Sequence, residues 1–393
     1  MAPNKKVSSN PLKILVAPNA FKESLSAMEA AEVITEGILK VMPGAQITKI
    51  PIADGGDGTL EAVVAGTRGK ICKARVLNPL GKRITAEYGI TGDGTTAIIE
   101  MSRASGLALV PPAKRNPMIT TSYGTGELIG TALDRGVKSI ILGIGGSATV
   151  DGGIGALQAL GIQFLGKDRN PVGPGGAGLQ ALRSIDWSGL DLRLRRTRLL
   201  VACDVDNPLV GRNGSAAVFG PQKGATPAMV TELDKALRKL AKLIQQITGK
   251  EISKLPGTGA AGGIAGSFKG LLDAQLRPGS DLVFDLLSVK RIVPQMDLII
   301  TGEGKIDFQT PFGKGPGMLA RLSQRYKVPV IGIAGSIGED VKSLFDRGFV
   351  AIFSIVNRPM ELEFALHNAA SLTRSTAEQI ARLLRLKMSG TRK

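Results

Sequence analysis

The chain has 393 residues, of which 43% are hydrophobic and 4% aromatic, and its formal net charge is +17. This composition is typical of an aliphatic α/β protein with room for two domains, and it argues against an intrinsically disordered or disulfide-stapled chain. The single histidine, His367, argues against histidine-based catalytic triads and histidine-rich zinc sites.

The N-terminal part of the chain predicts alternating strands and helices after a flexible tail over residues 1–10. The segment KILVAPNAFKESLSAMEAAEVITEGILKVMPG, from Lys13, predicts a buried strand followed by an amphipathic helix. Ser26 and Glu29 have capping-box spacing at the start of this helix, and Pro43 and Gly44 end it. QITKIPIA predicts a second strand and TLEAVVAG a second helix, and this alternation favours a parallel sheet.

The middle of the chain begins with a different pattern. ICKARVLNPLGKRITAEYGITGDGTTAIIEMS predicts three strands joined by Pro/Gly turns, and therefore an antiparallel arrangement. The helix-then-strand pattern resumes at TSYGTGELIGTALDRGVKSIILGIGG and continues with the strand RLLVACDVDNPLVG. PAMVTELDKALRKLAKLIQQITG predicts a long amphipathic helix, and GTGAAGGIAGSFKGLL is glycine-rich with helical spacing in its second half.

The last part of the chain returns to a simple α/β pattern. MDLIITGEGKID, VPVIGIAGSI and VAIFSIVN predict three strands separated by helices. We therefore predict a doubly wound, mostly parallel α/β domain formed by residues 11–66 and 286–393, with a mixed α/β domain, 67–285, inserted into it. An alternative places part of the middle α/β segment in the first domain.

Charge, cysteine content and hydropathy indicate where the protein works and with what. Two cysteines far apart, Cys72 and Cys203, suggest a reducing compartment, and no secretory signal or membrane-spanning run is present, so we expect a cytoplasmic protein that does not enter membranes. Basic residues are scattered, and the cluster RLRRTR at 193–198 is interpreted as solvated surface charge without nucleic-acid binding. A homo-oligomer is compatible with the sequence, and His367 is interpreted as a half-buried helical residue.

Five polar, glycine-containing turns follow predicted strands, where ligands of open α/β sheets bind. They are APNAFKES, ADGGDGT, GIGGSATVDGG, ACDVDNP and TGEGKID. In the third turn, Gly143, Gly145 and Gly146 would let the backbone approach a ligand closely, while Ser147 and Thr149 add hydroxyl donors. Free N–H groups at the helix start near Ile154 would favour an anion, so a phosphate chain is the expected occupant. Tight strand–helix packing would explain one or two of these glycines instead.

The third turn also suggests a competing chemistry. No G-x-x-x-x-G-K-[ST] loop occurs in the chain, but residues 143–148 satisfy the loose dinucleotide pattern G-x-G-x-x-G/A. A nicotinamide-dependent oxidoreductase of a small hydroxy acid is therefore one alternative. A nucleotide-binding protein with little turnover is another.

Phosphoryl transfer fits the available side chains better, because it needs a phosphate cradle, Mg²⁺ held by carboxylates, cations for the developing charge and a carboxylate that accepts a hydroxyl proton. The candidate carboxylates are Asp54, Asp57, Asp204, Asp206, Glu303 and Asp307. The candidate cations are Lys22, Lys223, Lys305 and Lys314. Lys22 and Lys305 are favoured, because both lie in turns directly after strands.

The chain resembles glycerate kinases of the bacterial type I family from about Lys13 to the C-terminal helix. The matching segments are FKESLSA, PIADGGDGT, SGLALVP, YGTGELI, GIGGSAT.DGG, ACDV.NPLVG.NG, FGPQKGAT, GAAGG and ITGEG.ID.QT..GK.P. The resemblance implies ATP- and Mg²⁺-dependent phosphorylation of D-glycerate, typically to 2-phosphoglycerate, in a two-domain α/β protein whose active site lies in the interdomain cleft.

Position by position, the resemblance assigns the strongest family segments to a defined set of residues. These are Lys22, Glu23, Ser24, Asp54, Gly55, Gly56, Gly145, Gly146, Ser147, Asp151, Asp204, Asn207, Gly302, Glu303, Asp307, Gln309 and Lys314. We expect the ATP phosphates on the Gly143–Gly153 turn and near TGEGKID, with Gly143, Thr149, Asp151, Gly302, Lys305, Asp307 and Lys314 among the nucleotide-binding residues. Glycerate would lie near Glu23, Ser24, Gly55, Gly56 and Asn207.

Three catalytic roles complete this hypothesis. Asp204 would orient or deprotonate the attacking hydroxyl. Asp54 and Glu303 would coordinate the metal, directly or through water, and Lys22 would offset negative charge. The chain departs from the family pattern at Asn19, Ala20, Val150, Lys305 and Phe308. The change at Asn19 matters most, because an amide cannot accept a proton or hold Mg²⁺ as a carboxylate does.

Overall fold

The computed structural model describes residues 11–53, 58–310 and 315–389, and the chain divides into two compact units. The first unit combines the chain up to Ala53 with the chain from Phe284 onward, and the second is the continuous segment that ends at Val283. Helix α2 (Thr59–Gly66) was expected in the first unit but belongs to the second. Its Leu60 and Val64 fill the space beside Gly89, where an added Cβ would lie 2.6 and 2.5 Å from their methyl groups.

The first unit is built on a parallel five-stranded sheet in the order β13-β12-β11-β1-β2. Its strands are β1 (Lys13–Val16), β2 (Gln46–Lys49), β11 (Leu298–Ile306), β12 (Val330–Ile337) and β13 (Phe349–Ser354). Strand β1 lies between β2 and β11, with Ile14 paired to Leu298, and its apolar side chains are fully buried. All five strands expected in this unit are confirmed, and so is the parallel arrangement.

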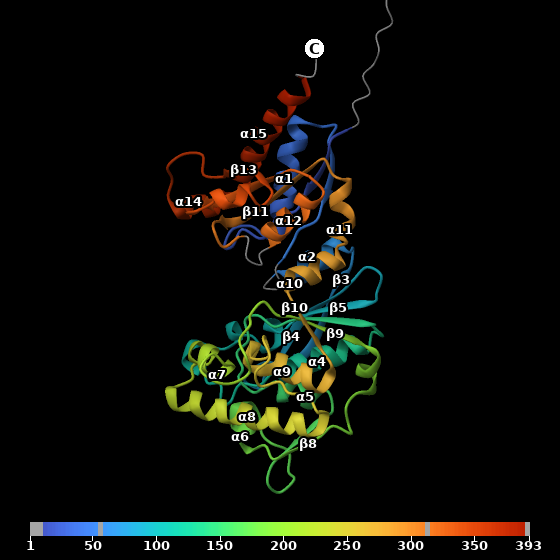
Figure 1. The fold of residues 1–393 in the computed structure, drawn as a ribbon, viewed down its shortest axis with the longest axis vertical. Helices are drawn as coiled ribbons and strands as arrows, with labels where there is room; N and C mark the ends of the chain where they lie inside the picture. The colour runs from blue at the N-terminus through green and yellow to red at the C-terminus, as the bar shows by residue number, and fades with distance from the viewer. Residues whose placement is uncertain (1–10, 54–57, 311–314, 390–393) are drawn as a thin grey trace, which may run out of the picture. The chain divides into compact units, whose positions relative to one another are not determined.

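Helix α1 (Ala27–Val41) begins and ends where the sequence predicts. The Ser26 Oγ accepts a hydrogen bond from the Glu29 N–H, and the Glu29 carboxylate accepts one from the Ser26 N–H, so the capping box is present. The helix ends at Val41, two residues before Pro43. α1 runs beside α15 (Ala369–Ser389), the blue and red helices of the first unit in Figure 1, and a Cβ on Gly37 would lie 2.8 Å from that of Ala377.

The second unit contains a mixed six-stranded sheet in the order β10-β9-β6-β5-β4-β3. Its strands are β3 (Lys70–Leu77), β4 (Arg83–Ile90), β5 (Thr96–Glu100), β6 (Ser139–Gly143), β9 (Arg198–Ala202) and β10 (Gln275–Arg277). β3, β4 and β5 pair antiparallel as predicted, and β5, β6, β9 and β10 pair parallel. A separate antiparallel pair is formed by β7 (Gln163–Leu165) and β8 (Ser184–Asp186).

One hydrophobic core joins this sheet to its helices. Helices α4 (Tyr123–Leu133), α5 (Ile154–Ala159) and α9 (Ile264–Leu272) pack against the sheet, with α8 (Pro227–Thr248) beyond them (Figure 1). On α8, Leu233, Leu237, Leu240 and Ile244 are buried at helical spacing, as its amphipathic sequence predicts. Gly249, with a φ of 74°, ends this helix in the left-handed conformation that glycine adopts at low cost.

The remaining described helices are short. They are α3 (Ser102–Ser105), η1 (Leu107–Leu109), η2 (Pro112–Lys114), α6 (Gly175–Ala181), η3 (Leu192–Arg196), α7 (Ser215–Phe219), η4 (Pro221–Lys223), η5 (Ala260–Gly263), α10 (Gly279–Leu286), α11 (Val289–Ile292), η6 (Val293–Gln295), α12 (Gly315–Arg325), α13 (Lys342–Phe345) and α14 (Leu362–His367). His367 is exposed at the end of α14, and not half-buried as expected, with its Nδ1 2.8 Å from the Glu363 carbonyl oxygen. No helix within the described ranges has the length and apolar content needed to cross a bilayer.

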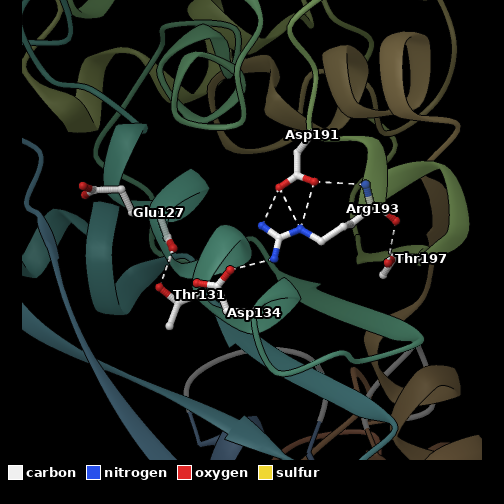
Figure 2. Close-up of polar contacts among 6 residues, drawn as sticks. All are labelled: Glu127, Thr131, Asp134, Asp191, Arg193 and Thr197. Carbon is white, nitrogen blue, oxygen red and sulfur yellow. Dashed lines mark hydrogen bonds and ion pairs between the residues drawn. The ribbon is translucent and has the colours of Figure 1, made fainter.

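The basic cluster at 193–198 includes an arginine that is held by acidic side chains of its own unit. Figure 2 shows the Arg193 guanidinium between Asp191 and Asp134, with nitrogen–oxygen distances of 2.6 Å to each carboxylate. The hydrogen bond from Arg193 lowers the pKa of the Asp191 carboxyl below its ordinary value. This contact ties η3 to the end of α4, so the charge of Arg193 is compensated within the unit.

Candidate active site

The carboxyl ends of β6 and β9 lie side by side in the second unit, with Gly143 paired to Ala202. The segments that follow these two strands share a cavity of about 410 Å³ with residues from three other places in the sequence. The cavity is lined by Leu107, Ile144, Gly145, Gly146, Ser147, Ala202, Cys203, Asp204, Val205, Phe219, Gln222, Lys223, Ala260 and Ala261. Two of the five predicted polar turns therefore meet at one cavity.

The first half of the glycine-rich turn, Gly143–Ser147, presents backbone to this cavity. Gly146 has a φ of +67°, which L-residues with a side chain rarely adopt. Within the described residues, the N–H groups of Gly145 and Gly146 have no acceptor in the chain, whereas the Gly146 carbonyl accepts from the Leu107 N–H at 2.7 Å. Unpaired N–H groups that line a cavity can donate to an anion.

The second half of the turn, residues 149–153, packs inside the unit. The Gly152 N–H donates to the Gly262 carbonyl at 2.9 Å, and an added Cβ on Gly262 would lie 2.0 Å from the Thr149 carbonyl oxygen. Thr149 and Asp151 are completely buried and do not line the cavity, although both were predicted to bind nucleotide. Both residues lie in the interior of the second unit, beneath the turn.

Asp151 occupies the helix start where a phosphate was expected. Its carboxylate accepts hydrogen bonds from the Ser122 N–H (2.8 Å), the Ser122 Oγ (2.7 Å) and the Gly153 N–H (3.0 Å). Burial raises the pKa of this carboxyl above its ordinary value. The protein's own carboxylate thus lies beside the start of α5, where the sequence predicted a phosphate, whereas the residues of the turn that line the cavity are Ile144, Gly145, Gly146 and Ser147.

Lys223 is the residue that sequence reasoning left out of the site. It follows α7 in the segment FGPQKGAT, it is 2% exposed, and it lines the cavity. Its Nζ donates to the Ser147 Oγ at 2.7 Å and to the Thr149 carbonyl at 2.8 Å. Burial lowers the pKa of Lys223 to about 7, although the negative charge of Asp151 acts in the opposite direction. The sequence offered it only as one of four candidate cations.

The segment after β9 brings an acid and a thiol to the same cavity. Asp204 is exposed, and its Oδ1 accepts a hydrogen bond from the Gly279 N–H at 3.0 Å. Cys203 Sγ donates to the Val205 carbonyl at 3.3 Å, and burial raises the pKa of this thiol. Asn207 does not line the cavity. Its Nδ2 donates to the Asn213 carbonyl at 2.9 Å, which holds the following loop.

In the first unit, predicted residues gather where β1 and β11 end. The Thr301 Oγ1 donates to the Ala17 carbonyl, and the Asn19 N–H donates to the Gly302 carbonyl at 2.8 Å. An added Cβ on Gly302 would lie 2.3 Å from the Ile333 carbonyl oxygen, so this glycine is required for sheet packing. The segment that follows Asn19 carries Lys22 and Glu23 exposed, with Ser24 half-buried.

Two carboxylates lie at the end of β11. Glu303 and Asp307 are each 6% exposed, and Thr310 Oγ1 donates to Glu303 Oε1 at 2.8 Å. Lys305 lies 3.2 Å from Asp307 Oδ2, and the Gln309 N–H donates to Asp307 Oδ1. Mg²⁺ prefers oxygen ligands and is commonly held by one or two carboxylates together with substrate phosphates, so these side chains fit it. Among the residues that the structure describes, no three His, Cys, Asp or Glu side chains form a metal-binding group by themselves.

Five candidate site residues lie outside the described residues, namely Asp54, Gly55, Gly56, Asp57 and Lys314. The structure shows the surroundings of three residues at which the chain departs from the family pattern. Asn19 Oδ1 accepts a hydrogen bond from the Ala20 N–H at 2.8 Å, Val150 is fully buried in the core of the second unit, and Phe308 is 50% exposed.

Comparison with known proteins identifies close relatives along the whole described chain. The model of the glycerate kinase family matches residues 14–385. A glycerate kinase of Bacillus subtilis (strain 168) is 51% identical over 95% of this chain and 98% of its own length. A glycerate 2-kinase of Escherichia coli (strain K12) is 46% identical over 96% of this chain and 99% of its own length.

A solved structure agrees with these sequence matches. A chain from Salmonella typhimurium LT2 that was assigned as glycerate kinase 2 is 49% identical and superposes with a TM-score of 0.90. The superposition covers 97% of this chain and 100% of the Salmonella chain.

Proposed function

The chain belongs to the glycerate kinase family and acts as a kinase on glycerate, and we propose that it transfers the terminal phosphoryl group of ATP to the 2-hydroxyl of D-glycerate, giving 2-phosphoglycerate and ADP. The 2-position is supported by the relative from Escherichia coli that is named a glycerate 2-kinase. The observation that carries the proposal is the cavity of the second unit, where the Gly145 and Gly146 amides and the Asp204 carboxylate are exposed together.

The amides of Gly145 and Gly146 would hold the ATP phosphates. They have no acceptor in the described chain, so a phosphate oxygen replaces water at these donors without breaking a protein hydrogen bond. The apolar walls formed by Leu107, Val205 and Phe219 would cover the less polar part of the nucleotide.

Asp204 would accept the proton of the attacking glycerate hydroxyl. It is exposed at the cavity, and its carboxylate is oriented by the Gly279 N–H. A carboxylate in hydrogen-bond reach of the nucleophilic hydroxyl is the group that phosphoryl transfer uses to orient or deprotonate the acceptor. The bond from the γ-phosphorus to the β,γ-bridging oxygen of ATP breaks as the glycerate oxygen bonds to that phosphorus.

The sequence assigned metal and substrate contacts to described residues that do not line this cavity. Glu303, buried and held by Thr310, would coordinate Mg²⁺, which neutralises phosphate charge when it is bound. Asp54, the other carboxylate assigned to the metal from the sequence, lies outside the described residues. Lys22 is exposed and would offset the charge of the glycerate carboxylate.

The oxidoreductase alternative finds no support in the geometry of the turn. A dinucleotide-binding G-x-G-x-x-G/A turn places the pyrophosphate at the start of the following helix. Here that position is taken by the Asp151 carboxylate, which accepts from Gly153. The family membership also favours phosphoryl transfer over hydride transfer.

Phosphorus NMR of a reaction with ATP, Mg²⁺ and D-glycerate tests this function. We expect resonances of ADP and 2-phosphoglycerate to grow together, and we expect no product when glycerate is omitted. The appearance of 3-phosphoglycerate would overturn the assignment of the 2-hydroxyl. ATP hydrolysis to phosphate without any phosphoglycerate would overturn the function.

A further inference from the structure

Lys223 is a buried cation without a counterion in contact. Both acceptors of its Nζ hydrogen bonds, the Ser147 hydroxyl and the Thr149 carbonyl, are neutral. Among the described residues, no ion pair is formed by this nitrogen, whose hydrogen-bond partners are these two oxygens. An ammonium group has three N–H donors, so one remains after these two bonds. A buried ammonium that lacks an anion is costly, and its environment therefore favours loss of a proton or binding of an anion.

The position of Lys223 allows an anion to bind beside it. The side chain lines the same cavity as the Gly145 and Gly146 amides. Its Nζ donates a hydrogen bond to the hydroxyl of Ser147, which directly follows Gly146 in the chain. The charge of an anion on those amides would therefore fall close to the lysine nitrogen. No other lysine or arginine lines this cavity in the part of the chain that the structure describes.

We infer that Lys223 is the cation that binds the phosphate group seated on Gly145 and Gly146, and that it takes up a proton when this group binds. The inference rests on the proposed function for the identity of the anion as a nucleotide phosphate. It adds a binding residue that the sequence did not place in the site, and it couples nucleotide affinity to pH.

The other ionisable groups around Lys223 do not replace that anion. Asp151, from the segment after β6, acts on it at a distance and is itself engaged by Ser122 and Gly153. Asp204 and Cys203, from the segment after β9, line the same cavity, and Arg115 belongs to the segment packed on Gly224. The neighbouring helices α7 and η5 and the turn η1 carry no ionisable side chain.

The depressed pKa of Lys223, about 7, gives the size of the coupling. At pH 7 about half of the free protein then carries a neutral lysine, so a bound phosphate that restores the charge takes up about half a proton per site. Loss of one charge-assisted hydrogen bond should weaken binding about 10- to 100-fold.

Isothermal titration calorimetry with ADP as the probe tests this coupling in the full-length protein at pH 7. Titrations in two buffers of different ionisation enthalpy give the number of protons taken up. The variants are Lys223→Met, which removes the amine, Lys223→Arg, which keeps a charge that does not titrate, and Lys235→Met, a control at an exposed lysine on α8. ADP's own proton exchange is common to all four proteins, so the differences report Lys223.

We expect wild type and Lys235→Met to take up about half a proton more than either Lys223 variant, and Lys223→Met to bind ADP about 10- to 100-fold more weakly. If Lys223→Met proves unfolded, the difference in proton uptake between wild type and Lys223→Arg alone tests the inference. Equal proton uptake in wild type and Lys223→Arg would overturn the inference, as would unchanged ADP affinity in a folded Lys223→Met.

Failure of the proposed function gives a different result. Wild type would then bind ADP with Lys223-dependent proton uptake but would make no phosphoglycerate, which supports the inference and overturns the function. A wild type that makes phosphoglycerate, while Lys223→Met keeps its ADP affinity and proton uptake, would overturn only the inference.

Discussion

Replacing Lys223 by methionine should remove a pH dependence from the stability of the second unit. Methionine is one heavy atom shorter than lysine, but it is also unbranched and flexible, replaces most of the apolar stem and cannot titrate. The lysine has a pKa of about 7 in the folded protein against an ordinary value of 10.5. Between these values the unfolded chain binds more protons than the folded one, so the free energy of unfolding rises with pH. The destabilising effect is therefore largest near and below pH 7 and disappears above pH 10.5.

The size of the effect follows from this difference in bound protons. When the unfolded state binds one proton more than the folded state, the free energy of unfolding rises by about 1.4 kcal/mol per pH unit. At pH 7 the native state already holds about half a proton on Lys223, and by pH 9 it holds almost none, so the difference grows from about half to about one. The wild-type free energy of unfolding should therefore rise by about 2 kcal/mol from pH 7 to pH 9 relative to that of Lys223→Met.

Fluorescence of the single tryptophan provides the assay. Trp187 lies in the second unit, so urea unfolding followed by its emission reports that unit. The difference between wild type and Lys223→Met is measured at pH 7 and at pH 9 with reductant present, and Lys235→Met, at an exposed position on α8, serves as the matched control. A Lys223→Met difference that stays the same at both pH values would refute the idea that this lysine loses its proton near neutrality.

Three further predictions concern the site and the fold. Asp204→Asn should lower kcat about 10²- to 10⁴-fold in a folded protein, because the amide cannot accept the hydroxyl proton; a normal kcat would remove Asp204 from this role. Gly146→Ala should destabilise the protein by about 1–2 kcal/mol and raise the KM for ATP, because its φ is +67°, whereas Gly130→Ala, with open space around its Cβ, should do neither in the same assays. Ser26→Ala should lower the free energy of unfolding by about 0.5–2 kcal/mol and speed amide hydrogen exchange in the first turn of α1. Unchanged exchange there would contradict the role of the cap.

Most of the fold could be predicted from the sequence because its signals are local. The capping box at Ser26, the glycine after α8 and the apolar runs of the strands each act within a few residues, and the structure contains all three. The position of α2 could not be predicted in this way. It depends on Leu60 and Val64 packing on Gly89, a contact between segments that are separate in the sequence.

The candidate site was only partly predictable for the same reason. The sequence pattern located the glycine-rich turn at the end of β6, but it could not separate Gly146, which lines the cavity, from Gly152, which packs against backbone. It also gave Asp151 to the nucleotide, although this side chain is buried and accepts hydrogen bonds from the Ser122 and Gly153 N–H groups. Lys223 stands 76 residues after Ser147, and no local pattern links the two.

The pairing of β1 with β11 has a consequence for synthesis of the protein on the ribosome. Ile14 pairs with Leu298, so a strand made at the beginning waits for a neighbour made about three-quarters of the way along the message. At about 5–20 residues per second this delay is on the order of half a minute, during which the whole continuous unit between them can emerge and fold. A messenger truncated between the codons for Val283 and Leu298 would yield the complete second unit preceded by β1, a hydrophobic strand that lacks one of its neighbours. Chaperones and proteases recognise exposed strands of this kind.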